Sequence, residues 1–164
     1  MSARVYVSLG SNVDREVMIR QAVELLRTHL GKLDLSPVYD SAAVGFDGSN
    51  FLNLVAGLST SLEVGSVVEI FRDIEDQLGR DRSLPKFASR PIDLDILTFD
   101  DLILDVPGIR IPRAEILYNA FVLKPLQDIA GDRLHPEVGE TYAALWQRMA
   151  PNAPRLDIYA MQLQ

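Results

Sequence analysis

The sequence predicts an α+β fold with a ferredoxin-like βαββαβ core, in which helices pack on a mostly antiparallel sheet. Two observations lead to this prediction. Apolar residues alternate with polar ones in some segments, as in strands, and recur every three to four positions in others, as in helices. The two kinds of segment follow one another in the order β-α-β-β-α-β along 164 residues, which we expect to form one domain, 1–164.

The first half of the core begins with a β-rich alternating segment, residues 4–9. Gly-Ser-Asn at 10–12 is expected to end this strand, and a helix over 14–29 follows with an aspartate at its N-cap. Residues 33–44 form a second extended segment, which Pro37 restricts to an edge strand or a bulged one.

The second half of the core repeats the pattern with a strand over 51–60 and a helix over 63–78. A loop at 80–90 leads into the alternating strand Ile-Asp-Leu-Asp-Ile at 92–96, and Leu-Ile-Leu-Asp-Val at 102–106 is expected to pair with that strand as a hairpin. The rest of the chain predicts helices at 120–130 and 139–149 and a loose tail.

Composition excludes several classes of protein. The net charge of −7 argues against non-specific binding to nucleic acid or to an acidic membrane. The chain has no cysteine, which excludes disulfides, thiolate nucleophiles and cysteine-based metal sites. No apolar run approaches the roughly 20 residues of a membrane span, and the N-terminus does not resemble a secretory signal. We therefore expect a cytoplasmic protein.

Two aspartates lie on one side of a strand that is otherwise apolar. Because successive side chains on a strand point to opposite faces, Asp93 and Asp95 share a face opposite Ile92, Leu94 and Ile96. At a separation of roughly 6.6 Å along the strand, their carboxylates repel by about 2–3 kcal/mol at an effective dielectric constant near 20. Open water or a bound cation must offset that repulsion.

The loop before this strand is basic, with Arg80, Arg82, Lys86 and Arg90 against the single acid Asp81. Arginine suits phosphate oxygens, and Mg²⁺ is usually held by one or two carboxylates together with substrate phosphates. The combination indicates phosphoryl or nucleotidyl transfer. The alternative is a solvated strand face beside an ordinary basic surface loop. No P-loop motif is present, so a nucleotide would not be bound in the Walker manner.

The stretch LGRDRSLPKFASRPIDLDIL at 78–97 resembles the signature of the 6-hydroxymethyl-7,8-dihydropterin pyrophosphokinases of folate biosynthesis. Three further blocks resemble the same family in the same order: VYVSLGSN at 5–12, FLNLV at 51–55 and AFVLKPLQDIA at 120–130. The resemblance extends over nearly the whole chain. It implies an enzyme that transfers the β,γ-diphosphate of ATP to the hydroxymethyl group of the reduced pterin and releases AMP.

The resemblance also implies a site for MgATP. Asp93 and Asp95 would hold two Mg²⁺ ions, and with Arg80 and Arg90 they would form the catalytic set. Positioning and metal electrostatics would carry most of the catalysis, because the attacking group is an alcohol. The expected ATP-binding residues are Glu75, Gln77, Arg82 and Arg113.

The implied pterin site consists of Phe51, Asn53 and Phe121, with backbone groups of Ser41 and Val44. Two phenyl faces can hold a flat bicyclic ring, and a side-chain amide can match the donors and acceptors at its edge. The alternative is that the two phenylalanines belong to the core and that Asn53 is a turn residue.

The chain departs from the family pattern near the end of the core. Arg113 stands where members often have a histidine near ATP, which keeps a cation but changes its geometry. Asn119 stands where members commonly have a basic residue just before the phenylalanine. Phe87 is the aromatic residue that stands in for the tryptophan that members often have before the key arginine. These changes concern ATP binding and leave the metal and pterin residues intact.

Two other functions remain open from the sequence. The chain could bind a nucleotide or pterin without turnover, or it could be a different metal-dependent nucleotidyltransferase that releases diphosphate rather than AMP. The complete set of Asp93, Asp95, Arg80 and Arg90 favours the enzyme, because a pure binding module has little need for both aspartates. We expect a monomer that works on small-molecule substrates.

Overall fold

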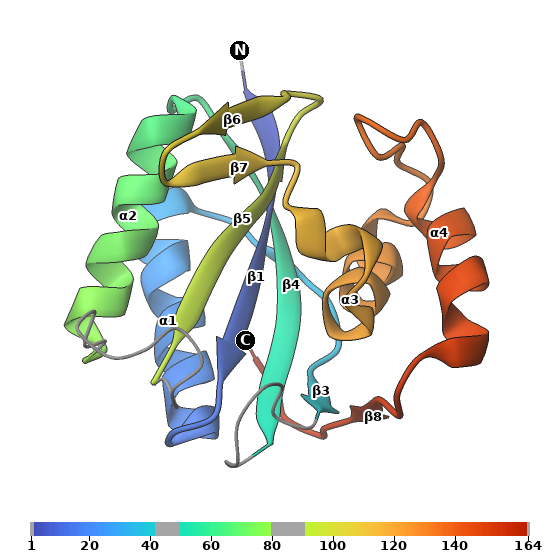
Figure 1. Cartoon of the computed structure of the whole chain (residues 1–164). Helices are drawn as coiled ribbons and strands as arrows, with labels where there is room; N and C mark the ends of the chain where they lie inside the picture. Colours follow the sequence, from blue (N-terminus) through green and yellow to red (C-terminus); the bar gives the residue numbers. More distant parts are fainter. Residues whose placement is uncertain (1, 42–49, 80–90, 164) are drawn as a thin grey trace.

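A computed structural model describes residues 2–41, 50–79 and 91–163. Its main sheet has the strand order β5-β1-β4-β3-β8 (Figure 1). The short β2 also pairs with β4, and the neighbouring strands are antiparallel. The strands of this sheet are β1 (Ala3–Ser11), β2 (Asp34–Leu35), β3 (Tyr39–Ser41), β4 (Phe51–Thr60), β5 (Asp93–Phe99) and β8 (Asp157–Ile158). The four core strands follow one another along the chain as β1, β3, β4 and β5. Their order across the sheet is therefore fourth, first, third, second, as in a ferredoxin-like sheet. The predicted fold class is confirmed.

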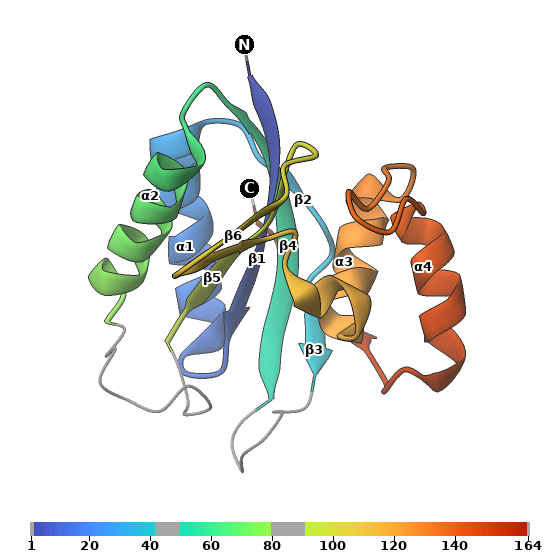
Figure 2. The same cartoon turned by 45° about the horizontal axis from the view of Figure 1, so that its top comes forward.

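The helices lie on both faces of the sheet (Figure 2). They are α1 (Arg15–Leu30), α2 (Val64–Gln77), α3 (Ala120–Ala130) and α4 (Tyr142–Met149), with short 3₁₀ helices η1 (Ala114–Leu117) and η2 (Ala150–Asn152). Helices α1 and α2 cover one face, where Val5, Val7 and Leu9 of β1 join the larger apolar core. Helices α3 and α4 pack on the other face around Tyr6 and Val55, in a smaller core. Among the described residues, no helix is long and apolar enough to cross a membrane.

The two helices of the predicted core cover one face, and α3 and α4 occupy part of the second one. Pro37 separates two short strands, β2 and β3, which both pair with β4, as the restriction on proline in strands predicts. Gly10 and Ser11 do not end the first strand, since both are paired within β1.

The predicted hairpin partner of β5 was wrong. The segment instead forms β6 (Leu104–Val106), which pairs with β7 (Ile109–Ile111) in a separate two-stranded sheet. Pro107 and Gly108 connect the two strands, and Gly108 has a φ of 87°. A proline followed by a glycine at positive φ favours a tight turn, so the local turn determines the pairing.

The predicted loose tail was also wrong. After η2 the chain returns to the sheet, where β8 pairs with β3 and the backbone amide of Tyr159 donates to the carbonyl of Val38 at 2.8 Å. Tyr159, Met161 and Leu163 pack against the larger core. The tail supplies hydrogen bonds and apolar cover to β3, which would otherwise be an exposed edge.

Candidate active site

A row of paired residues across three strands forms the floor of the candidate site. Gly10 of β1 is in register with Asp93 of β5 on one side and with Asn53 of β4 on the other. Paired residues point to the same face, here the face on which α3 packs. Because neighbouring strands are about 4.8 Å apart, Asp93 and Asn53 are separated by roughly 10 Å, the width of a small bicyclic ligand.

Glycine at position 10 keeps this floor open. A Cβ atom there would lie 2.9 Å from Oδ1 of Asn53 and 3.8 Å from Cδ1 of Phe51. The first distance is too short for a carbon–oxygen contact, so any larger residue would displace the Asn53 amide. The sequence analysis gave Gly10 no chemical role, and the structure adds a steric one.

The two aspartates of β5 are placed as the alternation predicts, with both side chains on this face. The side chain of Asp95 is 27% exposed. Its burial, together with the neighbouring charge of Asp93, raises the pKa of Asp95 to about 7, although Arg113 acts in the opposite direction. The pair is therefore a concentration of negative charge that a cation would stabilise.

Arg113 lies beside this pair. Its guanidinium nitrogen is 3.5 Å from Oδ1 of Asp95, and its Nε donates to Glu115 at 2.8 Å. The backbone amide of Arg113 donates to the carbonyl of Leu97, which fixes the segment between β7 and η1 against β5. Burial tends to lower the pKa of Arg113, but the charges of Asp95 and Glu115 raise it above the ordinary value, so the residue remains a cation.

A cavity of about 160 Å³ brings Asp93, Asp95 and Arg113 together with Glu75. Glu75 is buried, and its Oε2 accepts a hydrogen bond of 2.9 Å from the backbone amide of Leu94, between the two aspartates. Glu75 thus supports β5 at its outer edge as well as lining the cavity.

The same cavity contains two arginines that the sequence analysis missed, Arg72 of α2 and Arg110 of β7. Arg72 is three residues before Glu75, so helical spacing alone could have placed both on one face. Arg110 could not have been found in this way, because the pairing of β6 with β7 was not foreseen. Gln77 is exposed and does not line this cavity.

The pterin residues predicted from the sequence lie on the same face as the aspartates. Nδ2 of Asn53 donates to Oγ of the buried Ser41 at 2.7 Å, and Ser41 is in register with Phe51 across β3 and β4. Phe121, at the start of α3, is partly buried against the smaller core. Val44, Arg80, Arg82 and Arg90 lie outside the described residues.

The residues present are compatible with magnesium held jointly with a substrate. In the described part of the chain, no group of three or more histidine or acidic side chains could form a protein-only metal site. Asp93 and Asp95 supply two carboxylates, which is the usual protein share for an Mg²⁺ ion that also binds phosphates and water.

A model of the 7,8-dihydro-6-hydroxymethylpterin-pyrophosphokinase (HPPK) family matches residues 6–131. The chain belongs to the HPPK family. The match includes the whole of the floor described above and all of α3. The expected family, the enzyme class and the link to folate synthesis are confirmed.

Individual HPPK relatives cover most of the chain. The chain is 38% identical over 143 residues to the 2-amino-4-hydroxy-6-hydroxymethyldihydropteridine pyrophosphokinase of Pseudomonas aeruginosa, with 84% of this chain and 86% of the relative covered. The corresponding enzyme of Bacillus subtilis is 36% identical over 133 residues, with 79% of each chain covered. The folic acid synthesis protein fol1 of Pneumocystis carinii is 35% identical over 88% of this chain, which spans only 20% of that longer protein.

Solved structures of HPPK-containing proteins share the fold. The Plasmodium falciparum HPPK-DHPS structure with pteroate superposes with a TM-score of 0.75 and 14% sequence identity, over 93% of this chain and 43% of that one. At this identity the likeness concerns the fold alone. It agrees with the ferredoxin-like order of the sheet.

Proposed function

We propose that this HPPK-family enzyme transfers diphosphate from ATP to 6-hydroxymethyl-7,8-dihydropterin on the floor formed by β5, β1 and β4. The hydroxyl oxygen of the pterin attacks the β-phosphorus, the bond to the oxygen bridging the α- and β-phosphates breaks, AMP leaves, and the hydroxyl proton is released to water. The observation that carries this assignment is the register row Asp93–Gly10–Asn53, with carboxylates at one end and a side-chain amide at the other.

The ATP side of this floor is the cavity next to β5. Asp93 and Asp95 would hold two Mg²⁺ ions, which supply electrostatic stabilisation of the transferred phosphates. Arg113, Arg110 and Arg72 line the same cavity and carry the positive charge that phosphate oxygens require. We extend the assignment to Arg80, Arg82 and Arg90, which the chain places shortly before β5. Glu75 holds the strand, and Gln77 follows at the end of α2.

The pterin side is the end of β4 next to β3. Phe51 and Phe121 would hold the ring, with Asn53 and the backbone of Ser41 and Val44 on its polar edge. The hydrogen bond from Asn53 to Ser41 fixes which end of the amide faces the ligand, because the nitrogen is directed toward Ser41. The amide oxygen is the end that lies over Gly10.

Product analysis tests this function against the two alternatives. The protein is mixed with MgATP and 6-hydroxymethyl-7,8-dihydropterin, and AMP, diphosphate and the pterin product are measured. We expect equal amounts of AMP and pterin diphosphate, a loss of at least 100-fold in Asp95→Ala, and an unchanged rate in Asp101→Ala, an exposed aspartate in the turn after β5. Release of free diphosphate would indicate a nucleotidyltransferase, and pterin binding without AMP would indicate a binding module.

We further propose that the chain works as a single-domain monomer in the cytoplasm. The described parts of the site all come from one copy of the chain, and its co-substrate ATP is a cytoplasmic metabolite. Light scattering during the assay should give the mass of one chain, and activity per chain should not depend on protein concentration.

A further inference from the structure

The C-terminal residues 153–163, here called the C-terminal strap, return from α4 to the back of the site. The strap pairs with β3 through β8, with Tyr39 opposite Ile158 and Asp40 opposite Asp157. Beyond β8, the carbonyl of Gln162 accepts a hydrogen bond from Arg20 of α1. The strap therefore joins the outer strand of the sheet to helix α1.

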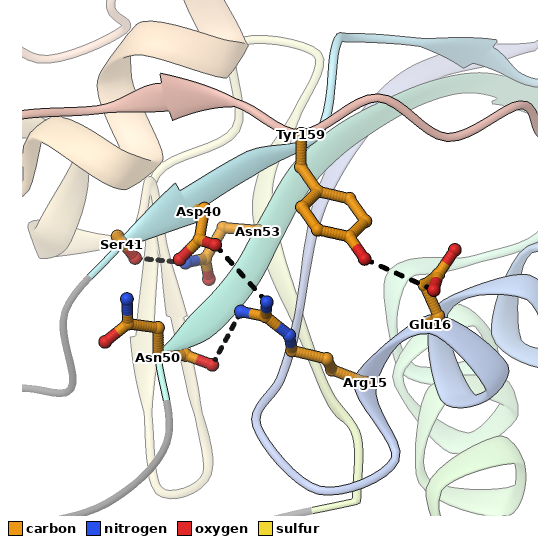
Figure 3. Close-up of polar contacts among 7 residues, drawn as sticks. All are labelled: Arg15, Glu16, Asp40, Ser41, Asn50, Asn53 and Tyr159. Carbon is orange, nitrogen blue, oxygen red and sulfur yellow. Dashed lines mark hydrogen bonds and ion pairs between the residues drawn. The ribbon is translucent and has the colours of Figure 1, made fainter.

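Tyr159 of the strap meets Arg15, the first residue of α1 (Figure 3). The guanidinium carbon of Arg15 is 5.2 Å from the centre of the Tyr159 ring, a cation–π distance. The tyrosine hydroxyl donates to Oε2 of Glu16 at 3.2 Å, which fixes the ring from its other end. Arg15 is thus held in place by a residue more than 140 positions away in the sequence.

The same guanidinium also binds the two strands of the pterin side. One nitrogen of Arg15 donates to the carbonyl of Asn50 at 3.1 Å, and another donates to Oδ2 of Asp40 at 3.3 Å (Figure 3). Asn50 comes just before Phe51, and Asp40 just before Ser41. The planar fork of arginine makes these contacts through two different nitrogens, whereas lysine has a single nitrogen at the end of its side chain.

The negative charge of Asp40 is compensated by Arg15. The side chains of Asp40 and Arg15 are 25% and 27% exposed, so solvent screens the ion pair only partly. Within the described residues, Oδ1 of Asp40 is buried and has no hydrogen-bond partner. Removal of Arg15 would leave this partly buried charge uncompensated, and β3 would have to shift to expose it.

Asp40 and Ser41 point to opposite faces of β3, because they are consecutive strand residues. Arg15 therefore acts from the α1 side of the sheet, whereas Ser41, Phe51 and Asn53 face the proposed ligand. Since Ser41 accepts the hydrogen bond that orients Asn53, a shift of β3 would reach the pterin amide directly.

We propose that the C-terminal strap positions the pterin side of the site from behind the sheet, with Tyr159 and Arg15 as positioning residues. This inference rests on the proposed function for the identity of the ligand. Neither residue needs to touch substrate. Their role is to fix the spacing of β3 and β4 at the point where Ser41 pairs with Phe51.

The test measures steady-state constants for both substrates in Tyr159→Ala, Tyr159→Phe and Arg15→Lys. We expect Tyr159→Ala to raise the KM for the pterin about five- to ten-fold, as loss of a partly buried cation–π contact implies. The KM for MgATP and kcat should stay within about two-fold, because the cavity beside β5 is not involved. Tyr159→Phe keeps the ring and should change little, whereas Arg15→Lys should resemble Tyr159→Ala.

Ile158→Ala is the matched control, since this strap residue is 68% exposed and pairs through its backbone. An unchanged pterin KM in Arg15→Lys and in folded Tyr159→Ala overturns the inference, as does an equal rise in both KM values. Hydrogen exchange over Asn50–Asn53 gives a readout independent of turnover. If wild-type protein makes no AMP, the proposed function fails. The strap is then judged by exchange alone, which must be faster in Tyr159→Ala and Arg15→Lys than in Ile158→Ala.

Discussion

Replacement of Asp95 by asparagine should stabilise the metal-free protein while abolishing its activity. The asparagine has the same shape, so the change removes one of two charges that repel by about 2–3 kcal/mol along β5. Arg113, 3.5 Å from Asp95, already offsets part of this repulsion. We therefore expect a gain in the free energy of unfolding of about 1–3 kcal/mol at pH 8.5, or roughly 3–8 °C in Tm for a domain of this size.

The gain should depend on pH, because burial and Asp93 raise the pKa of Asp95 to about 7. Between pH 4 and pH 7 the folded protein holds a proton that the unfolded chain has released, so the contribution of Asp95 to stability falls as the pH rises. Above pH 7 the full penalty applies to wild type. At pH 4 the unfolded chain is also about half protonated at this position, and the difference from Asp95→Asn should shrink to about 0.5 kcal/mol.

Thermal unfolding of both proteins without metal, from pH 4 to pH 8.5, measures this difference. Asp101→Asn, in the exposed turn after β5, is the control for a general effect of net charge. In a second scan, added MgATP should raise the Tm of wild type more than that of Asp95→Asn, since a ligand stabilises only the protein that binds it. An Asp95→Asn protein no more stable than wild type at pH 8.5, or a difference that does not change with pH, would contradict repulsion between Asp93 and Asp95.

Three further predictions concern residues around the site and the second core. Gly10→Ala should raise the pterin KM at least ten-fold with little loss of stability, because its Cβ would lie 2.9 Å from Oδ1 of Asn53; kinetics with both substrates and a melting curve check this. Glu75→Ala should destabilise the protein by about 1–3 kcal/mol, since it removes the acceptor for the buried Leu94 amide, and Glu75→Gln should recover most of that loss in denaturant titrations. Burial lowers the pKa of His135, whose Nδ1 accepts from the amides of Glu137 and Val138. Stability from His135 should therefore be lost as the pH falls below about 6.5, and His135→Asn, which keeps an acceptor there, should lose less stability between pH 7 and pH 5.

Local sequence patterns were enough to predict the core elements and the chemistry of one strand. The alternation around Asp93 and Asp95 was enough to place both carboxylates on one face, because side-chain direction along a strand follows from backbone geometry alone. The same logic gave β4, α2 and α3 nearly residue for residue. The spacing of apolar residues and the order of strands and helices along the chain were together enough to predict the ferredoxin-like arrangement.

Which distant residues meet depends on long-range packing. The register of β1 against β4 and β5 brought Gly10 between Asn53 and Asp93, and no local pattern encodes that register. The C-terminal strap looked loose because its few apolar residues have no period of their own, and they find partners only in the larger core and beside β3. Local periodicity reports which face a residue takes, whereas long-range pairing depends on the shape of the whole sheet.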